Sequence, residues 1–272
     1  MGNGTKVTVL ISCMYQENAD IIKKTNVQTD VVVINQCDKE EIEDFEFVNI
    51  KGENCHAKFI CTKERGLSRS RNMAIRNSWG DICLICDDDE LLEDDYESRI
   101  IDAYNQYPNE QVILFMVERK DLPYVKKYPV APQKVGIRQI LQSSSVQVSF
   151  KRDAIINANI QFDILLGSGS GNGGGEDNKF LLDIRKAKLN LFYTPVCIGA
   201  VQKGGESLWF HGFTKQYMIN RGWTSRRSLG STLGFLYILT FGIRHYKNYR
   251  PEMNCLQAYY YLLKGFCEKR EQ

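Results

Sequence analysis

The first hundred residues predict an α/β fold with a mixed, mainly parallel sheet flanked by helices. Short β-branched runs at 6–14 and 30–35 read as strands, helical stretches separate such runs, and an apolar run at 81–86 stops on a group of acids. Short strands that alternate with helices are typical of parallel sheets covered on both faces. In such sheets ligands bind outside the carboxyl ends of the strands.

The expected elements follow one another with only one clear boundary, near residue 213. Beyond Gly212 the sequence is helical and basic. In order, we expect strand 6–14, helix 17–25, strands 30–35 and 46–50, helix 67–78, strand 81–86, helix 94–107, strand 111–118, loop 120–132, strands 135–140 and 146–150, and a helix from 176 to about 188.

Composition fits a soluble globular protein of 272 residues, but its charges are unevenly placed. The net charge of +2 argues against nucleic acid as a partner. Between Lys215 and Arg270 there are ten Lys or Arg and two Glu, whereas 38–53 and 87–97 are acidic. Such asymmetry predicts a surface that meets something anionic, either a membrane face or a ligand that carries phosphate.

Three features of the sequence predict a cytoplasmic location. Nine cysteines, an odd number without framework spacing, fit a reducing compartment. No secretion signal opens the chain, and the apolar stretch 231–243 is shorter than the ~20 residues that span a bilayer. A peripheral contact with the inner membrane face is also expected, with Tyr237, Phe241 and Tyr249 at the interface. An ordinary helical cap and a dimer contact are the alternatives.

The most informative motif is the acidic run Asp87-Asp88-Asp89-Glu90. Carboxylates crowded at the end of a buried strand repel one another unless a cation neutralises them, and Mn²⁺ or Mg²⁺ prefers such oxygen ligands. If the chain stays extended here, Asp87 and Asp89 point the same way and share one metal. The alternative is an acidic loop that caps the next helix.

A second unusual segment, 167–175, contains glycine, serine and asparagine alone and leads into Glu176 and Asp177. Apolar flanks indicate that it lies against core and is more than a flexible linker. Its glycines would let the loop approach and close over a ligand. The two acids are candidates for a catalytic base, or else a favourable charge in the first turn of a helix.

Basic residues precede the acidic run. Arg65, Arg69 and Arg71, followed by Asn72, offer guanidinium groups to phosphate or to the acids, unless they form a solvated basic face.

An aromatic segment near the expected boundary contains two further candidates. His211 is a candidate nitrogen ligand for the same metal, or a satisfied, partly buried residue. Trp209 either stacks on a sugar ring or packs in the core.

Together these motifs resemble family two glycosyltransferases with the GT-A fold, especially bacterial members that build capsule and other surface polysaccharides. The similarity covers roughly residues 5 to 215, and the order of the motifs is more specific than any one of them. The motifs are Asn35-Gln36-Cys37-Asp38, Arg65-Gly-Leu-Ser-Arg-Ser-Arg71-Asn72, Gly80-Asp-Ile-Cys-Leu-Ile-Cys-Asp87-Asp-Asp89 and Gly173-Gly-Gly-Glu176-Asp177.

The resemblance implies a role for each motif. Asp89 would hold the metal that bridges the diphosphate, Asp87 would contact the ribose or the metal, and Asp177, with Glu176 second, would be the catalytic base. The remaining implied residues are Asn35, Gln36, Asp38, Arg65, Arg71, Asn72 and Asp88 for the nucleotide, His211 for the metal, and Trp209, Gly174 and Gly175 for the sugar or acceptor. Two positions depart from the family pattern: Asn35-Gln36 replaces its usual acid pair, and His211 has only a loosely defined counterpart.

The implied enzyme is a metal-dependent, inverting hexosyltransferase. It would use a nucleotide-diphosphate donor, expected to be a UDP-sugar, and a hydroxyl of a glycan or lipid-linked glycan. Residues 1–213 would form the catalytic domain, with a nucleotide-binding half at about 1–107 and an acceptor half at about 108–213, followed by the helical segment 214–272. The alternatives are a sugar-1-phosphate nucleotidyltransferase, whose glycine-rich and basic loop after the first strand is missing here, and a glycan- or nucleotide-binding module without catalysis.

Overall fold

The structure, a computed structural model, describes residues 4–122, 124–202 and 212–270 of the chain. The chain divides into two compact units. Unit 1 consists of Met1–Arg65, Arg69–Gln161 and Asp183–Gly204, and unit 2 of Gly66–Ser68, Phe162–Leu182 and Gly205–Gln272. Because unit 2 is assembled from three separate segments, the expected division near residue 213 stays a prediction.

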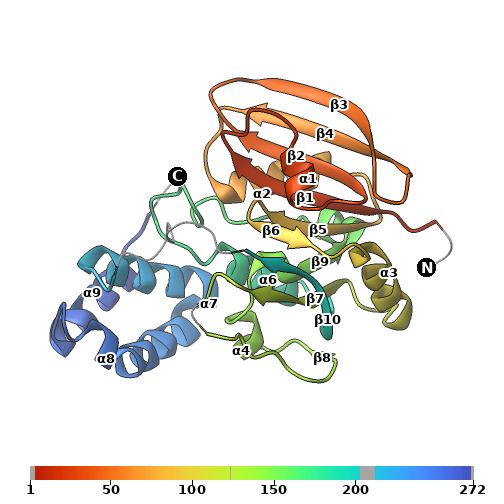
Figure 1. Cartoon of the computed structure of the whole chain (residues 1–272). Helices are drawn as coiled ribbons and strands as arrows, with labels where there is room; N and C mark the ends of the chain where they lie inside the picture. The colour runs from red at the N-terminus through yellow and green to blue at the C-terminus, as the bar shows by residue number, and fades with distance from the viewer. Residues whose placement is uncertain (1–3, 123, 203–211, 271–272) are drawn as a thin grey trace. The chain divides into compact units, whose positions relative to one another are not determined.

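Within its described residues, unit 1 is built on a ten-stranded sheet in the order β3-β4-β2-β1-β5-β9-β7-β10-β6, with β8 paired to β10 (Figure 1). The strands are β1 (Val7–Met14), β2 (Asp30–Gln36), β3 (Glu41–Val48), β4 (Asn54–Thr62), β5 (Ile82–Asp87), β6 (Glu90–Leu92), β7 (Val112–Arg119), β8 (Gln133–Lys134), β9 (Val148–Lys151) and β10 (Leu191–Val201).

Six of the ten described strands run in the same direction, so the sheet is mixed and mainly parallel, as expected. β4, β2, β1 and β5 form one parallel block, and β7 is parallel to β10. β9 lies antiparallel between β5 and β7, so these two strands run in the same direction. The carboxyl ends of all six parallel strands therefore meet at one edge of the sheet, where ligands bind in this class of fold.

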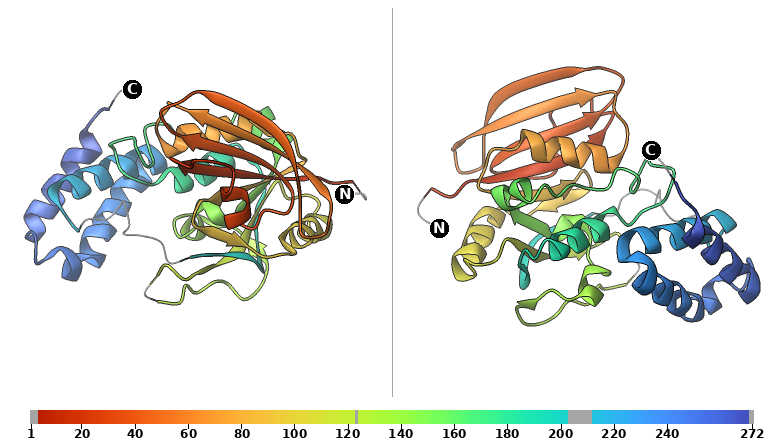
Figure 2. Two further views of the ribbon diagram at one scale, coloured as in Figure 1. Left: turned by 45° about the horizontal axis from the view of Figure 1, so that its top comes forward. Right: turned by 180° about the vertical axis from the view of Figure 1, so that it is seen from behind.

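Apolar side chains on both faces of the central strands explain why this sheet is buried. In β1, β2 and β5 nearly every side chain is buried, and continuous apolar runs of this kind form strands that are covered on both faces. The short helix α1 (Ile21–Lys24) lies on one face (Figure 1), and α2 (Leu67–Asn77) crosses the other, as the view from behind in Figure 2 shows. Helix α3 (Tyr96–Gln106) buries Tyr96, Ile100, Ala103 and Tyr104 in the same core.

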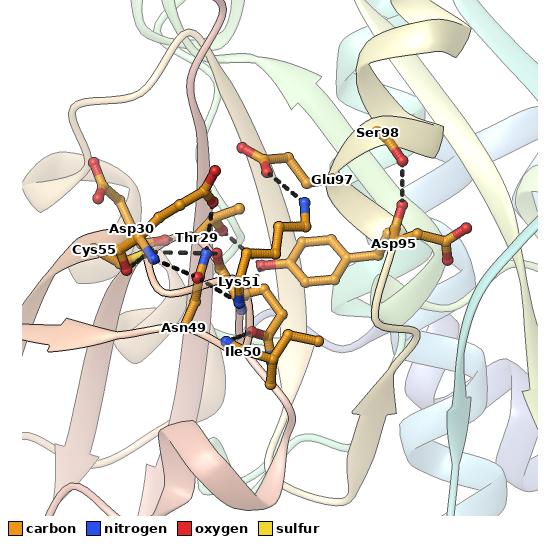
Figure 3. A network of polar contacts seen from close by, with 12 residues as sticks. Thr29, Asp30, Asn49, Ile50, Lys51, Cys55, Asp95, Glu97 and Ser98 are labelled. Carbon is orange, nitrogen blue, oxygen red and sulfur yellow. Dashed lines mark hydrogen bonds and ion pairs between the residues drawn. The ribbon is translucent and has the colours of Figure 1, made fainter.

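A network of polar contacts lies in unit 1 at the amino ends of the parallel strands, opposite the edge where their carboxyl ends meet (Figure 3). Asn49 accepts hydrogen bonds from the backbone N–H groups of Lys51 and Glu53, each at 2.9 Å, and donates one to the carbonyl of Gln28 at 2.9 Å. The turn between β3 and β4 is therefore fixed by side-chain hydrogen bonds.

Several predicted elements differ from the structure. The segment 135–140 is no strand, because α4 (Ile137–Ile140) follows Gly136 and buries Ile140. The helix expected over 17–25 is reduced to α1, and the strand expected over 46–50 begins earlier, as β3. The sequence did not predict β4 or β10. The other short elements are η1 (Ser145–Gln147), α5 (Arg152–Asn157) and α6 (Glu176–Lys186).

Unit 2 contains the C-terminal helices α7 (Lys215–Arg244), α8 (Tyr246–Tyr249) and α9 (Cys255–Cys267). α7 is broken at Gly230, whose φ of 76° only glycine adopts easily. Glycines also let α7 and α9 touch: a Cβ on Gly222 would lie 1.9 Å from the carbonyl oxygen of Leu262, and one on Gly265 1.8 Å from that of Ile219. No side chain larger than hydrogen fits at either position.

Two of the three aromatic residues expected at a membrane interface lie in the core of unit 2. Phe241 is 6% exposed and Tyr249 is fully buried, so that expectation was wrong for both. Tyr237 packs against this core but is only partly buried, and for this residue the expectation stays a prediction. Among the described residues, no helix is both long and apolar enough to cross a membrane.

Candidate active site

The acidic run forms a turn between two strands. β5 ends at Asp87, the chain turns at Asp88 and Asp89, and β6 begins at Glu90. The chain is therefore not extended at this point, and alternation along a strand is not what orients the acids. The turn is fixed from the neighbouring strand, because the N–H of Gln202 donates to the carbonyl oxygen of Asp89 at 2.9 Å.

Charge is concentrated at this turn. Partial loss of hydration, and then repulsion by Asp87 and Asp88, raise the pKa of Asp89 from 3.8 to about 6. Burial and Asp87 also raise the pKa of Asp88, and Glu90, only 1% exposed, has a pKa well above its ordinary value because it is buried. A hard divalent cation would relieve this repulsion, and carboxylate oxygens are the ligands it prefers.

The donor set is therefore suitable for Mn²⁺ or Mg²⁺, with Asp87 and Asp89 as the ligands at hand. Across the described part of the chain, no group of three or more His, Cys, Asp or Glu is arranged to hold a metal. His211 and Trp209 lie outside the described residues, in the segment that follows β10.

A buried arginine supports the turn from behind. Arg71, on α2, is 3% exposed and donates from Nη2 to Asp87 Oδ1 at 2.8 Å and to Ser145 Oγ at 2.7 Å. Its neighbour Asn72 is equally buried. The structure thus brings together Arg71 and the first acid of the run, as the sequence suggested, and adds Ser145, which no sequence motif indicated.

The turn after β1 is attached to β2. Asn35 is fully buried, its Nδ2 donates to the carbonyl of Gln16 at 2.8 Å, and its Oδ1 accepts from the N–H of Gln16 at 3.0 Å. Gln36 is 4% exposed. An ionised aspartate at position 35 could not donate a hydrogen bond to that carbonyl. This hydrogen bond therefore explains why an amide side chain suits this position.

Beside this turn lie Asp38 and Tyr15, which are exposed, and Arg65, which is partly buried. Arg65 Nη2 donates to Asp38 Oδ1 at 2.6 Å, and its guanidinium lies 5.5 Å from the centre of the Tyr15 ring. Tyr15 is 59% exposed and has a φ of 51°, uncommon for any residue but glycine. An exposed aromatic face in a strained conformation at the ligand edge is a candidate platform for a flat base.

Charged residues at and after the end of β7 (Val112–Arg119) were not among the predicted site residues. Arg119 makes a two-pronged ion pair with Asp121, and Asp121 adds to the rise in the pKa of Asp89. Lys126 donates to Gln147 Oε1 at 2.9 Å, and burial and Arg119 lower its pKa to about 8. The only sign of these residues in the sequence is that charged residues directly follow the apolar run 112–117.

The predicted base belongs to unit 2. Glu176 is 6% exposed, and its Oε2 accepts the N–H of Gly175 at 2.8 Å, whereas Asp177 is only partly buried. Glu176 therefore fixes the end of the glycine-rich loop. Asp177 is the better candidate to meet a substrate, because a base must reach the proton that it removes.

The glycine-rich loop is well anchored within unit 2. Ser68 Oγ donates to the carbonyl of Leu166 at 2.7 Å, and the N–H of Gly167 donates to the carbonyl of Gly173 at 3.1 Å. A Cβ on Gly175 would lie 2.7 Å from Thr224 Cγ2. A freely flexible linker is excluded, and Gly174 and Gly175 lie directly before the two acids.

Comparison with known proteins identifies the family of this chain and a similar fold. The model for "Glycosyl transferase family 2" matches residues 18–160, which is 143 of the 272 residues. Among curated proteins, none matches the chain.

Solved structures of Staphylococcus aureus TarS are similar in fold. TarS 1–349 has 14% sequence identity and a TM-score of 0.62, over 96% of this chain and 80% of that one. TarS 1–349 in complex with UDP-GlcNAc has 13% identity and a TM-score of 0.64, over 96% and 79%. The complex with UDP has 12% identity and a TM-score of 0.60, over 97% and 81%.

At this level of identity the structures show the fold alone, and that fold is the GT-A-like architecture expected from the sequence. The family match covers more than half of the chain and includes β5, the acidic turn and Arg71. The chain is a glycosyltransferase and belongs to glycosyl transferase family 2.

Proposed function

We propose that this enzyme moves a sugar from a UDP-sugar to a hydroxyl of a glycan or lipid-linked glycan in surface polysaccharide synthesis, with a divalent metal and inversion at the anomeric carbon. The observation that carries the proposal is the acidic turn after β5, where Asp89 has a pKa raised to about 6 beside Asp87, itself held by buried Arg71. The complexes of TarS with UDP-GlcNAc and UDP support a donor of this kind.

In unit 1 the donor's nucleotide would lie along the carboxyl ends of β1, β2 and β5. The exposed ring of Tyr15 offers a stacking face for uracil, and Asp38 and Arg65 offer hydrogen bonds to its edge. Arg71 and Asn72, both buried on α2, would lie beneath the bound nucleotide. This arrangement uses groups that already have fixed positions, which reduces the entropy lost when the donor binds.

Asp89 and Asp87 would hold Mn²⁺ or Mg²⁺. When bound, the ion supplies positive charge to the diphosphate that departs. Lys126, beside the Arg119–Asp121 ion pair, adds a positive charge after β7 at the same edge of unit 1, which would lower the repulsion between the acids and a diphosphate.

In unit 2, Asp177 would act as the base. Its carboxylate takes the proton of the acceptor hydroxyl while that oxygen bonds to the anomeric carbon. The bond from the anomeric carbon to the β-phosphate oxygen breaks at the same time, and the electron pair leaves with UDP. Attack from the face opposite the departing diphosphate inverts the anomeric configuration.

Replacing Asp177 by Asn tests the base. Donor binding should be retained, while turnover falls by about 10²- to 10⁴-fold because the amide cannot accept the proton. Lys188→Ala, at the exposed turn after α6, serves as the control and should transfer sugar at the parental rate. An Asp177→Asn enzyme as fast as the parent would remove this residue from the mechanism.

The products separate the proposal from its alternatives. A transferase releases UDP only with acceptor and metal together, and NMR of the first product shows the inverted anomer. Release of pyrophosphate from UTP and a sugar phosphate would instead indicate a nucleotidyltransferase. Binding of the UDP-sugar without release of UDP from it, even with acceptor and metal present, would indicate a binding module.

We also propose that unit 2 contacts the inner face of the membrane. On α7 and α9 large apolar side chains point to solvent, including Ile243 at 75% exposed and Leu256 at 83%. The 36 residues from Lys215 to Arg250 include seven Lys or Arg and no acid. Exposed apolar side chains on basic helices are typical of segments that lie on anionic lipid.

Flotation with vesicles of phosphatidylglycerol and phosphatidylcholine tests this contact. The parent should float with the anionic vesicles in low salt and be released by high salt, because the Debye length shortens. Ile243→Glu and Leu256→Glu should each weaken flotation, whereas Val130→Glu, a residue 95% exposed in unit 1, should not. Flotation that is equal for all four proteins, or absent in the parent, would exclude the contact.

A further inference from the structure

The glycine-rich loop depends on its neighbours for its conformation. Gly167, Gly169, Gly171, Gly173 and Gly175 all have positive φ, between 75° and 116°. Glycine loses more conformational entropy on ordering than any other residue, so a loop with six glycines is costly to hold in one conformation.

One residue of the loop, Asn172, makes several of the hydrogen bonds that hold it. Asn172 donates from Nδ2 to the carbonyl of Leu165 at 3.1 Å, and its N–H donates to Ser170 Oγ at 3.1 Å. Its Oδ1 accepts from Nη1 of Arg270 at 2.9 Å, across 98 positions of the sequence. Arg270 is therefore the link between this loop and the segment that follows α9.

Arg270 is itself firmly placed. The same Nη1 donates to Asn220 Oδ1 on α7 at 2.9 Å, while Nε and Nη2 donate to Glu268 Oε2 at 3.0 and 2.7 Å. The guanidinium lies 5.0 Å from the centre of the Trp223 ring, and its side chain is only 13% exposed. A planar fork that stacks on an aromatic ring and bonds in several directions is specific to arginine.

A second guanidinium holds the segment that enters the loop. Arg227 lies 5.3 Å from the same Trp223 ring and donates to both carboxylate oxygens of Asp163, with Nη2 to Oδ1 at 2.8 Å. The segment before the loop is therefore attached to α7 directly, and the loop itself is attached to α7 through Arg270. The geometry of the predicted base follows from these contacts, because Asp177 stands two residues after the loop.

We propose that Arg270 is a positioning residue: it holds the glycine-rich loop, and through it Asp177, in the conformation used for sugar transfer. The inference rests on the proposed function, since it assigns the loop to the catalytic step. The contacts of Arg270 with Asn172, Asn220 and Trp223 all lie within unit 2. Its loss should therefore change the rate of chemistry while donor affinity in unit 1 remains.

Kinetics of Arg270→Ala and Arg270→Lys test the proposal, with Lys269→Ala, an exposed neighbour, as the matched control. Both Arg270 variants should lose about 10- to 100-fold in kcat, since a base displaced by an ångström is a poor base. Their KM for the donor should stay within about threefold, because uniform binding is unchanged. The Lys269→Ala enzyme should match the parent in both constants.

Chemical rescue separates positioning from general stabilisation. Guanidinium ion at low millimolar concentration should restore part of the kcat of Arg270→Ala, because it can occupy the vacated place over Trp223. Methylammonium should not, because it lacks the planar fork. The Lys variant should not respond to either ion. A kcat equal to the parent in both variants, or a loss that no guanidinium relieves, would overturn the assignment.

Hydrogen exchange keeps this inference distinct from the proposed function. The amides of Gly167, Ser170 and Asn172 are hydrogen-bonded within the loop, so Arg270→Ala should speed their exchange at least tenfold and leave β1 unchanged. If the parent transfers no sugar but the variant shows this change, the proposed function fails and the anchoring of the loop stands. Unchanged exchange in the loop would overturn the role of Arg270, whatever the activity.

Discussion

Replacing Asp89 by Asn should make the metal-free protein more stable while abolishing its activity. In the parent, Asp89 has a pKa of about 6 in the folded state, compared with 3.8 ordinarily. Each pH unit of difference corresponds to ~1.36 kcal/mol, so the full shift would be ~3 kcal/mol. Asp89 is exposed to solvent, and screening reduces the expected effect to about 1 kcal/mol.

The sign of this effect fixes its pH dependence. Between pH 3.8 and about 6 the folded state binds more protons at Asp89 than the unfolded state does, so the contribution of this carboxyl to stability is lost as pH rises through this window. The Asn variant has no such loss. The excess in free energy of unfolding of Asp89→Asn over the parent should be absent at pH 3.8 and below, grow up to about pH 6, and stay constant above.

Urea denaturation in EDTA, followed by circular dichroism at pH 4 and pH 7.5, measures the two free energies of unfolding. The exposed residue Asp102 on α3 supplies the control, since Asp102→Asn should stay within ~0.5 kcal/mol of the parent at both pH values. Mn²⁺ should stabilise the parent and the control but not Asp89→Asn. A variant that is less stable than the parent at pH 7.5 would refute the argument from charge repulsion.

Three further substitutions test other parts of the molecule. Asn49→Ala removes hydrogen bonds at the amino ends of the strands and should lower the free energy of unfolding by about 2 kcal/mol with kcat unchanged, as urea denaturation and kinetics would show. Gly265→Ala should lower it by about 3 kcal/mol, because its Cβ would lie 1.8 Å from the carbonyl of Ile219, whereas Gly136→Ala, with nothing within 4 Å, should melt like the parent. Tyr15→Ala should raise the KM for the UDP-sugar about tenfold and leave kcat within a factor of two, since stacking on a base is worth ~1–3 kcal/mol; an unchanged KM would show that uracil binds elsewhere.

The central sheet could be predicted from the sequence because its strands are continuous apolar runs. β1, β2, β5 and β7 have this character, and each was expected within about two residues of its actual bounds. β3 was placed too late because acids alternate with its apolar residues, as suits an edge strand. β10 was missed because Pro195 interrupts it, next to irregular pairing with β7.

The candidate site was predictable where a motif is local in sequence. The acidic run and Glu176-Asp177 were visible because their residues are adjacent in the chain. Tyr15, Arg119 and Lys126 were not, because their relevance depends on which strand ends lie together. The segment 135–140 was predicted wrongly because its apolar residues fit a strand and a single helical turn equally well, and only Gly136, directly before α4, favours the helix.

The outermost strand limits how copies of this enzyme can assemble. Among the described strands, β3 is an edge strand that pairs with β4 alone, and it carries Glu41, Glu43, Asp44 and Glu46. If the β3 strands of two molecules paired, two rows of carboxylates would be brought together. Their repulsion at neutral pH disfavours association of two molecules through this edge of the sheet. Acidic buffers would remove that barrier, which makes storage near neutrality the safer choice for concentrated samples.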